Sequence, residues 1–318
     1  MYDVTATGEL LIDFTRNGLS EQNNRIYEAN PGGAPCNVLA MLGKLGYKTA
    51  FIGKVGEDEF GKLLKNTITE QKIDAAGLIL DPNAKTTLAF VDNDETGDRS
   101  FSFYRKPGAD MMLREDEVNY ELIDNCRIFH FGSLSMTDEP VRSATYAMID
   151  YAKKKNKIIS FDPNLRPPLW ESEELAAKQI WYGIEKCDIL KIADNEIEWL
   201  TGTDDYDKGV EIIRQRTHAK LINVTLGPNG SIAYYGDHKV FMEPYLNENT
   251  IETTGAGDTF GACALHAVLK NGLDNMTEED LKEMLQFANA AASLVTTKKG
   301  ALRVMPEEKE IKELTNKY

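Results

Sequence analysis

The sequence has no long apolar run and no leader-like start. None of its apolar stretches approaches the ~18 consecutive residues that a membrane-spanning helix needs. Its first residues, Met1-Tyr-Asp-Val-Thr, lack the basic region and the apolar run of a signal peptide. We therefore expect a soluble, cytoplasmic protein without a membrane partner.

Positive charge is in short supply. The chain of 318 residues has 36 Lys and Arg against 51 Asp and Glu, a formal net charge of −15. Nucleic acids and anionic membranes are bound by a surplus of Lys and Arg, so both are excluded as expected partners. A small anionic substrate remains compatible, but backbone amides, a few cations or a metal must then offset its charge.

Cysteine and histidine are scarce as well. The four cysteines, Cys36, Cys126, Cys187 and Cys263, lie far apart without a CxxC pair. This spacing does not support a zinc or redox motif and suits a reducing compartment. The four histidines form no metal-binding pattern, and His130, between two phenylalanines, is typical of a core histidine.

Short apolar runs alternate with longer amphipathic segments along most of the chain. Such alternation predicts a three-layer α/β/α sandwich with a mostly parallel central sheet, because parallel strands are joined by helices that cover both faces. The expected strands are Val4–Ala6, Thr49–Ile52, Ile128–Phe131, Ile158–Phe161, Ile189–Ile192 and Leu221–Leu226. The expected helices are Ala34–Leu45, Phe60–Gln71, Pro140–Lys154, Ala176–Lys186, Tyr206–Thr217, Thr259–Lys270, Thr277–Val295 and Glu307–Lys317.

Two regions break this rhythm. Residues 15–30 are polar and rich in Asn, and residues 86–104 show the period-two pattern of a hairpin around a turn at 92–98. We expect these regions to form a small β-sheet that projects as a lid, with strands within about 12–30 and 86–112 inserted into a single domain of residues 1–318. A surface hairpin without function is the alternative.

The motif Thr253-Thr-Gly-Ala-Gly-Asp258 precedes the expected helix 259–270. Glycines before a helix N-terminus expose N–H groups, which bind anions such as a γ-phosphate. An aspartate at the same place could accept a proton from a hydroxyl that attacks phosphorus. The alternative is that Asp258 only caps the helix.

Other glycine motifs are weaker on their own. Gly32 and Gly33 precede the helix that contains Asn37 and would let a ligand approach the backbone, although a plain loop-to-helix transition fits as well. Gly227 and Gly230 could make room for a nucleotide or simply form a hairpin turn. The segment 56–62 is not a Walker A loop, because it lacks the Ser or Thr for Mg²⁺ and carries three acidic residues.

The two strongest glycine motifs together resemble those of the ribokinase-like (PfkB-type) carbohydrate kinases. Residues 32–37 with 42–46 are similar to the amino-terminal signature of that family, and residues 252–258 are similar to its carboxyl-terminal one. The resemblance covers essentially the whole chain. Within the family, residues 8–14, 101–105, 129–133 and 162–166 are most similar to fructokinases.

The resemblance implies a set of site residues. It implies that Asp258 is the general base and that Gly255, Ala256 and Gly257 form the anion hole. It implies sugar contacts from Asp13, Gly32, Gly33, Asn37, Phe103, Arg105 and Arg166. It places ATP against Asn164, Lys191, Thr225, Gly227, Gly230 and Asn289, with Glu196 organising Mg²⁺ through water.

Glu252 departs from the pattern, since the family usually has aspartate at this place. In potassium-activated members, that aspartate and the residue matching Thr254 help to bind the monovalent cation. A K⁺ site at Glu252 and Thr254 is therefore in doubt, because glutamate moves the carboxylate by a methylene.

We accordingly predict an ATP-dependent carbohydrate kinase that phosphorylates a primary hydroxyl of a ketohexose, with D-fructose giving fructose 6-phosphate. The first alternative is a kinase for a sugar acid such as 2-keto-3-deoxygluconate, because Arg105 and Arg166 could pair with a carboxylate. A sugar-binding regulatory homologue without catalysis is the second. A homodimer through the lid strands is expected from the family and from the need to cover exposed strand edges.

Overall fold

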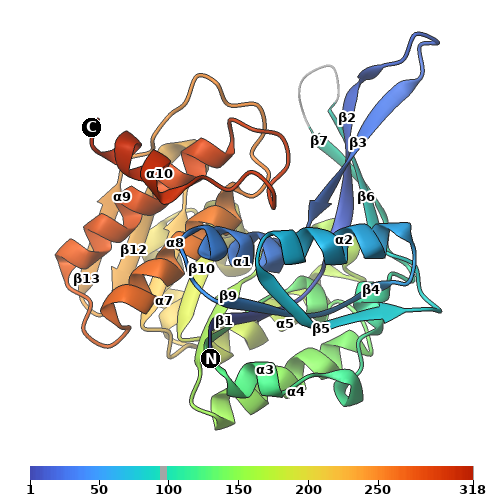
Figure 1. Cartoon of the computed structure of the whole chain (residues 1–318). Helices are drawn as coiled ribbons and strands as arrows, with labels where there is room; N and C mark the ends of the chain where they lie inside the picture. Colours follow the sequence, from blue (N-terminus) through green and yellow to red (C-terminus); the bar gives the residue numbers. More distant parts are fainter. Residues whose placement is uncertain (94–98, 318) are drawn as a thin grey trace.

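A nine-stranded sheet forms the centre of the molecule in the computed structural model, which describes residues 1–93 and 99–317 (Figure 1). Its strands lie in the order β13-β12-β11-β10-β9-β8-β1-β4-β5. Neighbours from β11 to β5 pair in parallel, while β12 and β13 add an antiparallel edge. The strands are β1 (Tyr2–Thr7), β4 (Thr49–Gly56), β5 (Ile73–Asp81), β8 (Cys126–Gly132), β9 (Ile158–Asp162), β10 (Ile189–Ala193), β11 (Leu221–Thr225), β12 (Ser231–Tyr235) and β13 (His238–Met242).

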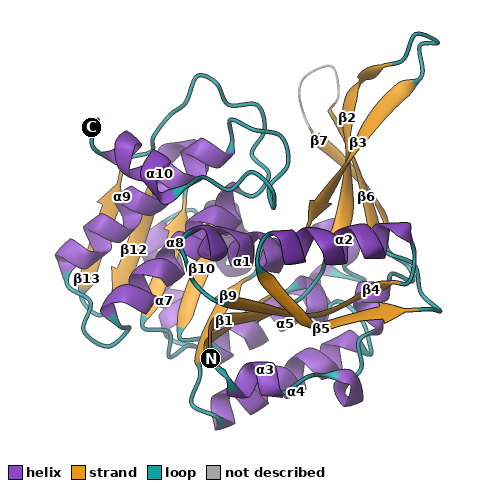
Figure 2. Ribbon diagram, viewed as in Figure 1, coloured by secondary structure: helices purple, strands orange, loops and turns teal. Residues whose placement is uncertain are grey.

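Helices cover both faces of this sheet (Figure 2). They are α1 (Ala34–Lys44), α2 (Glu59–Glu70), α3 (Glu121–Asp124), α4 (Val141–Lys154), α5 (Glu173–Lys186), α6 (Asp194–Thr201), α7 (Tyr206–Arg214), α8 (Ala256–Asn271), α9 (Glu278–Val295) and α10 (Glu308–Thr315). One apolar cluster joins the sheet to α1, α8 and α9, and a second cluster joins it to α4, α5 and α7. Since successive strand side chains point to opposite faces, β8 supplies Ile128 to the first cluster and Phe129 to the second. The predicted three-layer α/β/α fold is confirmed.

A second sheet of four strands projects from the first, in the order β3-β2-β6-β7 (Figure 1). It consists of β2 (Leu11–Leu19), β3 (Arg25–Gly32), β6 (Leu88–Asn93) and β7 (Arg99–Tyr104). The antiparallel pairing of β6 with β7 confirms the predicted hairpin. Of the predicted turn at 92–98, residues 92 and 93 belong to β6, and residues 94–98 lie outside the described residues. The predicted second lid segment, which extends to residue 112, runs past the last strand, because residues 109–112 form a 3₁₀ helix.

The helix starts differ in their N-cap residues. Side chains of Asp58, Ser172 and Thr277 accept N–H bonds at the starts of α2, α5 and α9. By contrast, α1 and α8 start after Gly33 and Gly255, at φ 130° and 78°, and neither glycine can offer a side-chain cap. Among the described α-helices, these two have glycine at the N-cap position, and they belong to the two glycine signatures.

Five elements of the main fold, β5, β12, β13, α3 and α6, were not among the expected strands and helices. The strand β5 was not predicted, although Leu78, Ile79 and Leu80 form a short apolar run in it. The helix α6 was not predicted either, since eight largely polar residues show too little periodicity. Within the described residues, no helix is both long and apolar enough to cross a membrane.

Candidate active site

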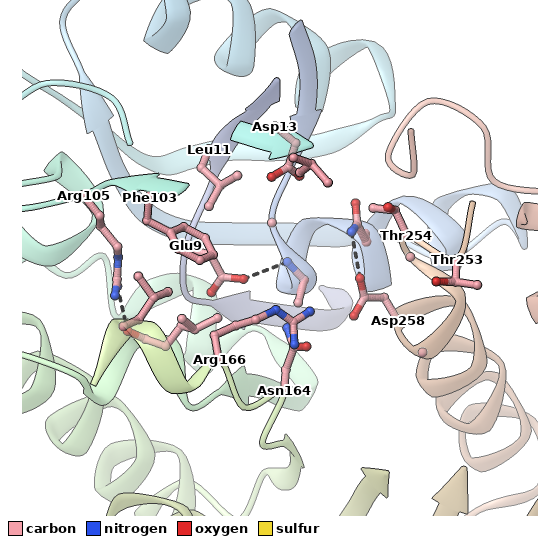
Figure 3. A pocket seen from close by; sticks show the side chains of 18 of the residues that line it. Glu9, Leu11, Asp13, Phe103, Arg105, Asn164, Arg166, Thr253, Thr254 and Asp258 are labelled. Carbon is pink, nitrogen blue, oxygen red and sulfur yellow. Dashed lines mark hydrogen bonds between the residues drawn. The ribbon is translucent and has the colours of Figure 1, made fainter. Parts of the chain in front are cut away.

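A cavity of about 280 Å³ lies between the carboxyl ends of the central strands and the four-stranded sheet (Figure 3). Strands of both sheets and the start of α8 contribute to it. Its lining includes Glu9, Leu11, Asp13, Thr15, Gly33, Ala34, Asn37, Val91, Phe103, Arg105, Leu134, Asn164, Arg166, Leu169, Lys191, Thr253, Thr254, Gly255, Gly257 and Asp258. Most of the residues predicted to contact sugar are thus brought together, and Gly32 lies just behind this wall.

Asp258 is buried at the edge of this cavity, with 9% of its surface exposed. Its Oδ2 accepts a hydrogen bond of 2.7 Å from Nδ2 of Asn37 (Figure 3). Burial and the nearby Asp162 carboxylate raise the pKa of Asp258 to about 6, against lowering effects from Asn37, Lys191 and Arg166. A carboxyl of this kind is ionised at neutral pH and can still take up a proton during a reaction.

The glycine loop before α8 has the geometry of an anion site. Gly255 adopts φ 78°, and a Cβ placed on it would lie 2.5 Å from Cβ of Ala301, so only glycine fits. The N–H of Ala256 donates to the carbonyl of Thr253 at 3.2 Å. The N–H of Gly257 belongs to the first helical turn, whose donors have no partner inside the helix. Gly257 is therefore a better-placed anion donor than Ala256.

Asp13 faces the same cavity from strand β2. Burial raises its pKa to about 7, and the carboxylates of Glu252 and Asp258 act in the same direction while Arg166 opposes them. A Cβ on Gly32 would lie 2.4 Å from Oδ2 of Asp13. Gly32 thus makes room for the Asp13 carboxylate, which explains why this glycine matters without lining the cavity.

Arg105 differs from what the sequence indicated. It borders the cavity, but its Nε donates to Asp110 at 2.8 Å, and its two terminal nitrogens donate to Thr137 and to the Leu134 carbonyl. Both charged side chains of the Arg105–Asp110 pair are almost fully buried. The guanidinium charge is therefore already neutralised by Asp110, and Arg166 is the more available of the two arginines in the wall of this cavity.

A second cavity of about 490 Å³ lies on the other side of the α8 start. Its walls include Lys191, Ala193, Asp194, Thr225, Gly227, Pro228, Gly230, Pro244, Tyr245, Leu246, Asn247, Thr250, Thr253, Ala256, Gly257, Phe260, Asn289, Ala292, Ser293 and Thr296. Four of the residues predicted at the ATP site line this cavity, namely Thr225, Gly227, Gly230 and Asn289. A largely apolar cavity of this size suits a nucleotide base.

The predicted ATP-site residues do not all lie in one place. Asn164, which was predicted to line the ATP site, follows β9 with φ 45° and lines the first cavity. Lys191 lines both cavities, and its Nζ forms an ion pair of 3.1 Å with Oδ2 of Asp162. Asn289 has its side-chain amide bonded to Ser231 and to the carbonyls of Met242 and Glu243. Asn289 therefore lines the second cavity while its side chain is hydrogen-bonded within the protein.

The acidic residues predicted near metal ions are bonded to backbone amides. Glu196 is buried and accepts N–H bonds from Leu165 at 2.7 Å and Ala193 at 2.8 Å. Burial raises its pKa, against the lowering effect of Lys191. Glu252 accepts the N–H of Gly300 at 2.7 Å. Within the described residues no group of three or more His, Cys, Asp or Glu side chains could hold a metal ion.

Glu9 was not predicted as a site residue from the sequence. It lines the first cavity, with 4% of its surface exposed, and its Oε1 accepts the N–H of Ala34 at 2.8 Å. Burial raises its pKa to about 7. The sequence did contain a signal, since Glu9, Leu11 and Asp13 alternate and would share one side of an extended chain.

Comparison with known proteins finds relatives along the whole chain. The family model described as pfkB family carbohydrate kinase matches residues 1–308. The chain is 42% identical over 309 residues to probable fructokinase-2 of Arabidopsis thaliana, covering 96% of this chain and 94% of that protein. It is 40% identical over 316 residues to fructokinase-1 of Zea mays, covering 99% and 98%.

Solved structures show the same fold. The fructokinase of Xylella fastidiosa with bound ATP superposes with a TM-score of 0.90 at 29% identity, covering 100% of this chain and 99% of that one. A double mutant of the fructokinase of Vibrio cholerae O395, with fructose, ADP and potassium ion bound, gives 0.88 at 30% identity, covering 99% and 98%. The matches extend over the whole length in both directions. The chain belongs to the pfkB family of carbohydrate kinases.

Proposed function

We propose that this protein is an ATP-dependent fructokinase that transfers the γ-phosphoryl group of ATP to a primary hydroxyl of D-fructose and releases fructose 6-phosphate. The observation that carries the proposal is the meeting of two cavities at the start of α8. Thr253, Gly257 and Lys191 line both of them. Asp258 stands at this junction, on the side of the first cavity. The sugar occupies the first cavity and ATP the second.

The residues at the junction fit an in-line transfer. Asp258 removes the proton from the attacking hydroxyl, while Asn37 fixes the orientation of its carboxylate through the bond to Oδ2. The N–H groups of Gly255 and Gly257, together with those of the first turn of α8, face charge that develops on the phosphoryl oxygens. Lys191, held by Asp162, adds a positive charge between the two cavities.

Further features of the first cavity fit a neutral sugar. Asn37 Oδ1 is buried without a hydrogen-bond partner among the described residues, and a sugar hydroxyl can donate to it. Asp13 offers a carboxylate acceptor on another wall, and Phe103 offers a ring.

The charge of this cavity argues against a sugar acid. Such a substrate would need Arg105 and Arg166 as its counter-charges. Asp110 already neutralises Arg105, whereas Glu9, Asp13 and Asp258 place three carboxyl groups around the same space. Because Lys191 is paired with Asp162, Arg166 is the main counter-charge that this wall offers a substrate carboxylate. A neutral ketohexose needs no such counter-charge.

ATP and Mg²⁺ are the proposed cofactors. The glycines of the second cavity bring the backbone close to the space that a nucleotide would fill, since Gly227 and Gly230 have φ of 54° and 96°. When bound to ATP, Mg²⁺ supplies positive charge to the phosphates and is held mainly by phosphate oxygens and water. Glu196 fits a role through water, because both of its oxygens already accept backbone N–H bonds.

The four-stranded sheet is the proposed lid of a single kinase domain that spans residues 1–318. It supplies Leu11, Asp13, Val91 and Phe103 to the sugar cavity and would exclude water from the transfer. Its surface carries Leu19, Ile26 and Tyr104 with 49%, 42% and 67% exposure. We propose that a second copy of the chain covers these side chains in a homodimer, which light scattering tests.

Steady-state kinetics on a sugar panel tests the proposed function. Fructose should give the highest kcat/KM, ribose a lower one and 2-keto-3-deoxygluconate the lowest, each measured with and without K⁺ because of Glu252. Preference for the acid would contradict the charge argument. Sugar binding without turnover on any sugar would instead identify a regulatory homologue.

A further inference from the structure

Glu9 occupies the link between the two sheets. One residue, Gly8, separates it from β1 of the central sheet, and one residue, Leu10, separates it from β2 of the four-stranded sheet. Figure 3 shows its carboxylate at the cavity, bonded to the backbone nitrogen at the start of α1. Glu9 therefore touches both the space assigned to the sugar and the helix that presents Asn37 to Asp258.

This carboxylate replaces the missing cap of α1. Gly33, at the N-cap position, has no side chain, and the first turn of α1 contains no acidic residue. Oε1 of Glu9 instead accepts a hydrogen bond of 2.8 Å from the backbone N–H of Ala34. The two segments are in tight contact as well, because a Cβ on Gly33 would lie 2.4 Å from the backbone oxygen of Glu9.

The charges around Glu9 leave it without an ion-pair partner among the described residues. Arg105 attracts it and Asp110 repels it, but these two pair with each other. From α1 the neighbouring ionisable group is the Cys36 thiol, whose own pKa is raised by burial. Across the cavity Arg166 is the remaining cation. A buried carboxylate in this setting is stabilised by additional hydrogen-bond donors.

We propose that Glu9 is a specificity-determining residue. One oxygen of its carboxylate caps α1, and the carboxylate also accepts a hydrogen bond from a hydroxyl of the bound ketohexose that is not the phosphorylated one. The inference rests on the proposed function. A sugar hydroxyl supplies the hydrogen-bond donor that the buried carboxylate requires. Because Glu9 lies in the wall of the first cavity, a sugar bound there can place such a hydroxyl against it. A site built to bond a hydroxyl discriminates against the analogue that lacks it.

The test is a thermodynamic cycle that combines a substitution of Glu9 with sugar analogues that lack one hydroxyl. Glu9→Gln keeps an oxygen for the Ala34 N–H but removes the charge. Its kcat and KM are measured with fructose and with deoxy analogues that each lack one hydroxyl that is not phosphorylated. The matched control is Glu59→Gln, an exposed glutamate in the first turn of α2 whose side chain is 88% accessible.

We expect Glu9→Gln to lower kcat/KM for fructose about 10- to 100-fold, mainly through KM, as befits a bond to a charged group. The wild type should lose a similar factor on one analogue. On that same analogue, wild type and Glu9→Gln should differ less than about 3-fold. Glu59→Gln should match the wild type throughout.

Two results would overturn the proposal. An equal loss on every sugar would show that Glu9 acts only as a helix cap, and no loss on fructose would show that it contacts no hydroxyl. Should Glu9→Gln fail to fold, Glu9→Asp, which keeps the charge and shortens the side chain, must show the same selective loss. If another sugar is the best wild-type substrate, the fructokinase proposal fails, and the cycle is carried out on that sugar instead.

Discussion

The two cavities share three wall residues but are built from different chemistry. The first has six charged residues in its wall, Glu9, Asp13, Arg105, Arg166, Lys191 and Asp258, whereas the second has two, Lys191 and Asp194. In the second cavity, glycines and apolar side chains set the shape. Under the proposed function, catalysis and sugar choice depend on charge on one side of α8, while nucleotide binding depends on backbone shape on the other.

The largest expected effect comes from the base. Asp258→Asn should lower kcat about 10²- to 10⁴-fold, because the amide cannot accept the hydroxyl proton at neutral pH. ATP affinity should change less than about 3-fold, since Asp258 faces the first cavity and not the second. Calorimetric titration with ATP beside steady-state kinetics checks both. Near-normal turnover would remove Asp258 from the mechanism.

The next effect separates the two arginines of the first cavity. Asp110→Asn should lower the free energy of unfolding by about 3–5 kcal/mol, because it leaves the buried Arg105 charge unpaired. Arg166→Gln should cost less than about 1 kcal/mol, since Arg166 is only partly buried and its described hydrogen bond is to the neighbouring Leu165 carbonyl. It should instead raise KM for the sugar. Urea unfolding and kinetics of both variants test this division of roles, which equal stability losses would refute.

A smaller effect concerns the backbone of the second cavity. A Cβ at Gly230, at φ 96°, would lie 2.2 Å from the Met242 carbonyl oxygen, whereas one at Gly227, at φ 54°, meets nothing within 4 Å. Gly230→Ala should therefore cost about 3 kcal/mol of unfolding free energy and raise KM for ATP. Gly227→Ala, the matched control, should cost about 1 kcal/mol. Similar KM values for ATP in both variants would contradict a shape-based site.

The smallest effect is a shift in pH dependence. Asp258 has a pKa raised to about 6 and must be ionised to act, so kcat should fall as the pH drops through about 6. Asn37 lowers that pKa by donating to the carboxylate. Removing it in Asn37→Ala should move the acid limb of kcat up by about one pH unit. The exposed Asn125→Ala serves as control, and an unmoved limb would mean that another group controls it.

Local sequence was sufficient where the backbone itself forms the site. Gly255 and Gly33 adopt positive φ at the starts of α8 and α1, and glycine is the residue that does so freely. The period-two pattern of residues 86–104 likewise predicted the hairpin of β6 and β7. These features depend on neighbours along the chain, which a sequence displays directly.

The chemical state of the side chains was not visible in the sequence. The sequence did not show that Asp110 lies against the Nε of Arg105, or that Asn164 borders the first cavity. Asp258 depends on Asn37, which lies 221 positions away. The pKa shifts of Glu9, Asp13 and Asp258 arise mainly from burial, which exists only after the layers have packed.

The sequence alone therefore determined the two glycine turns, the alternation of strands and helices, and the family to which the signatures point. Only the tertiary structure decided which charges are free, which are paired and which cavity each residue borders. The physical reason is the distance along the chain over which each effect acts. Backbone conformation is selected by sterics within a few residues, while desolvation and ion pairing depend on groups that the order of the strands brings together.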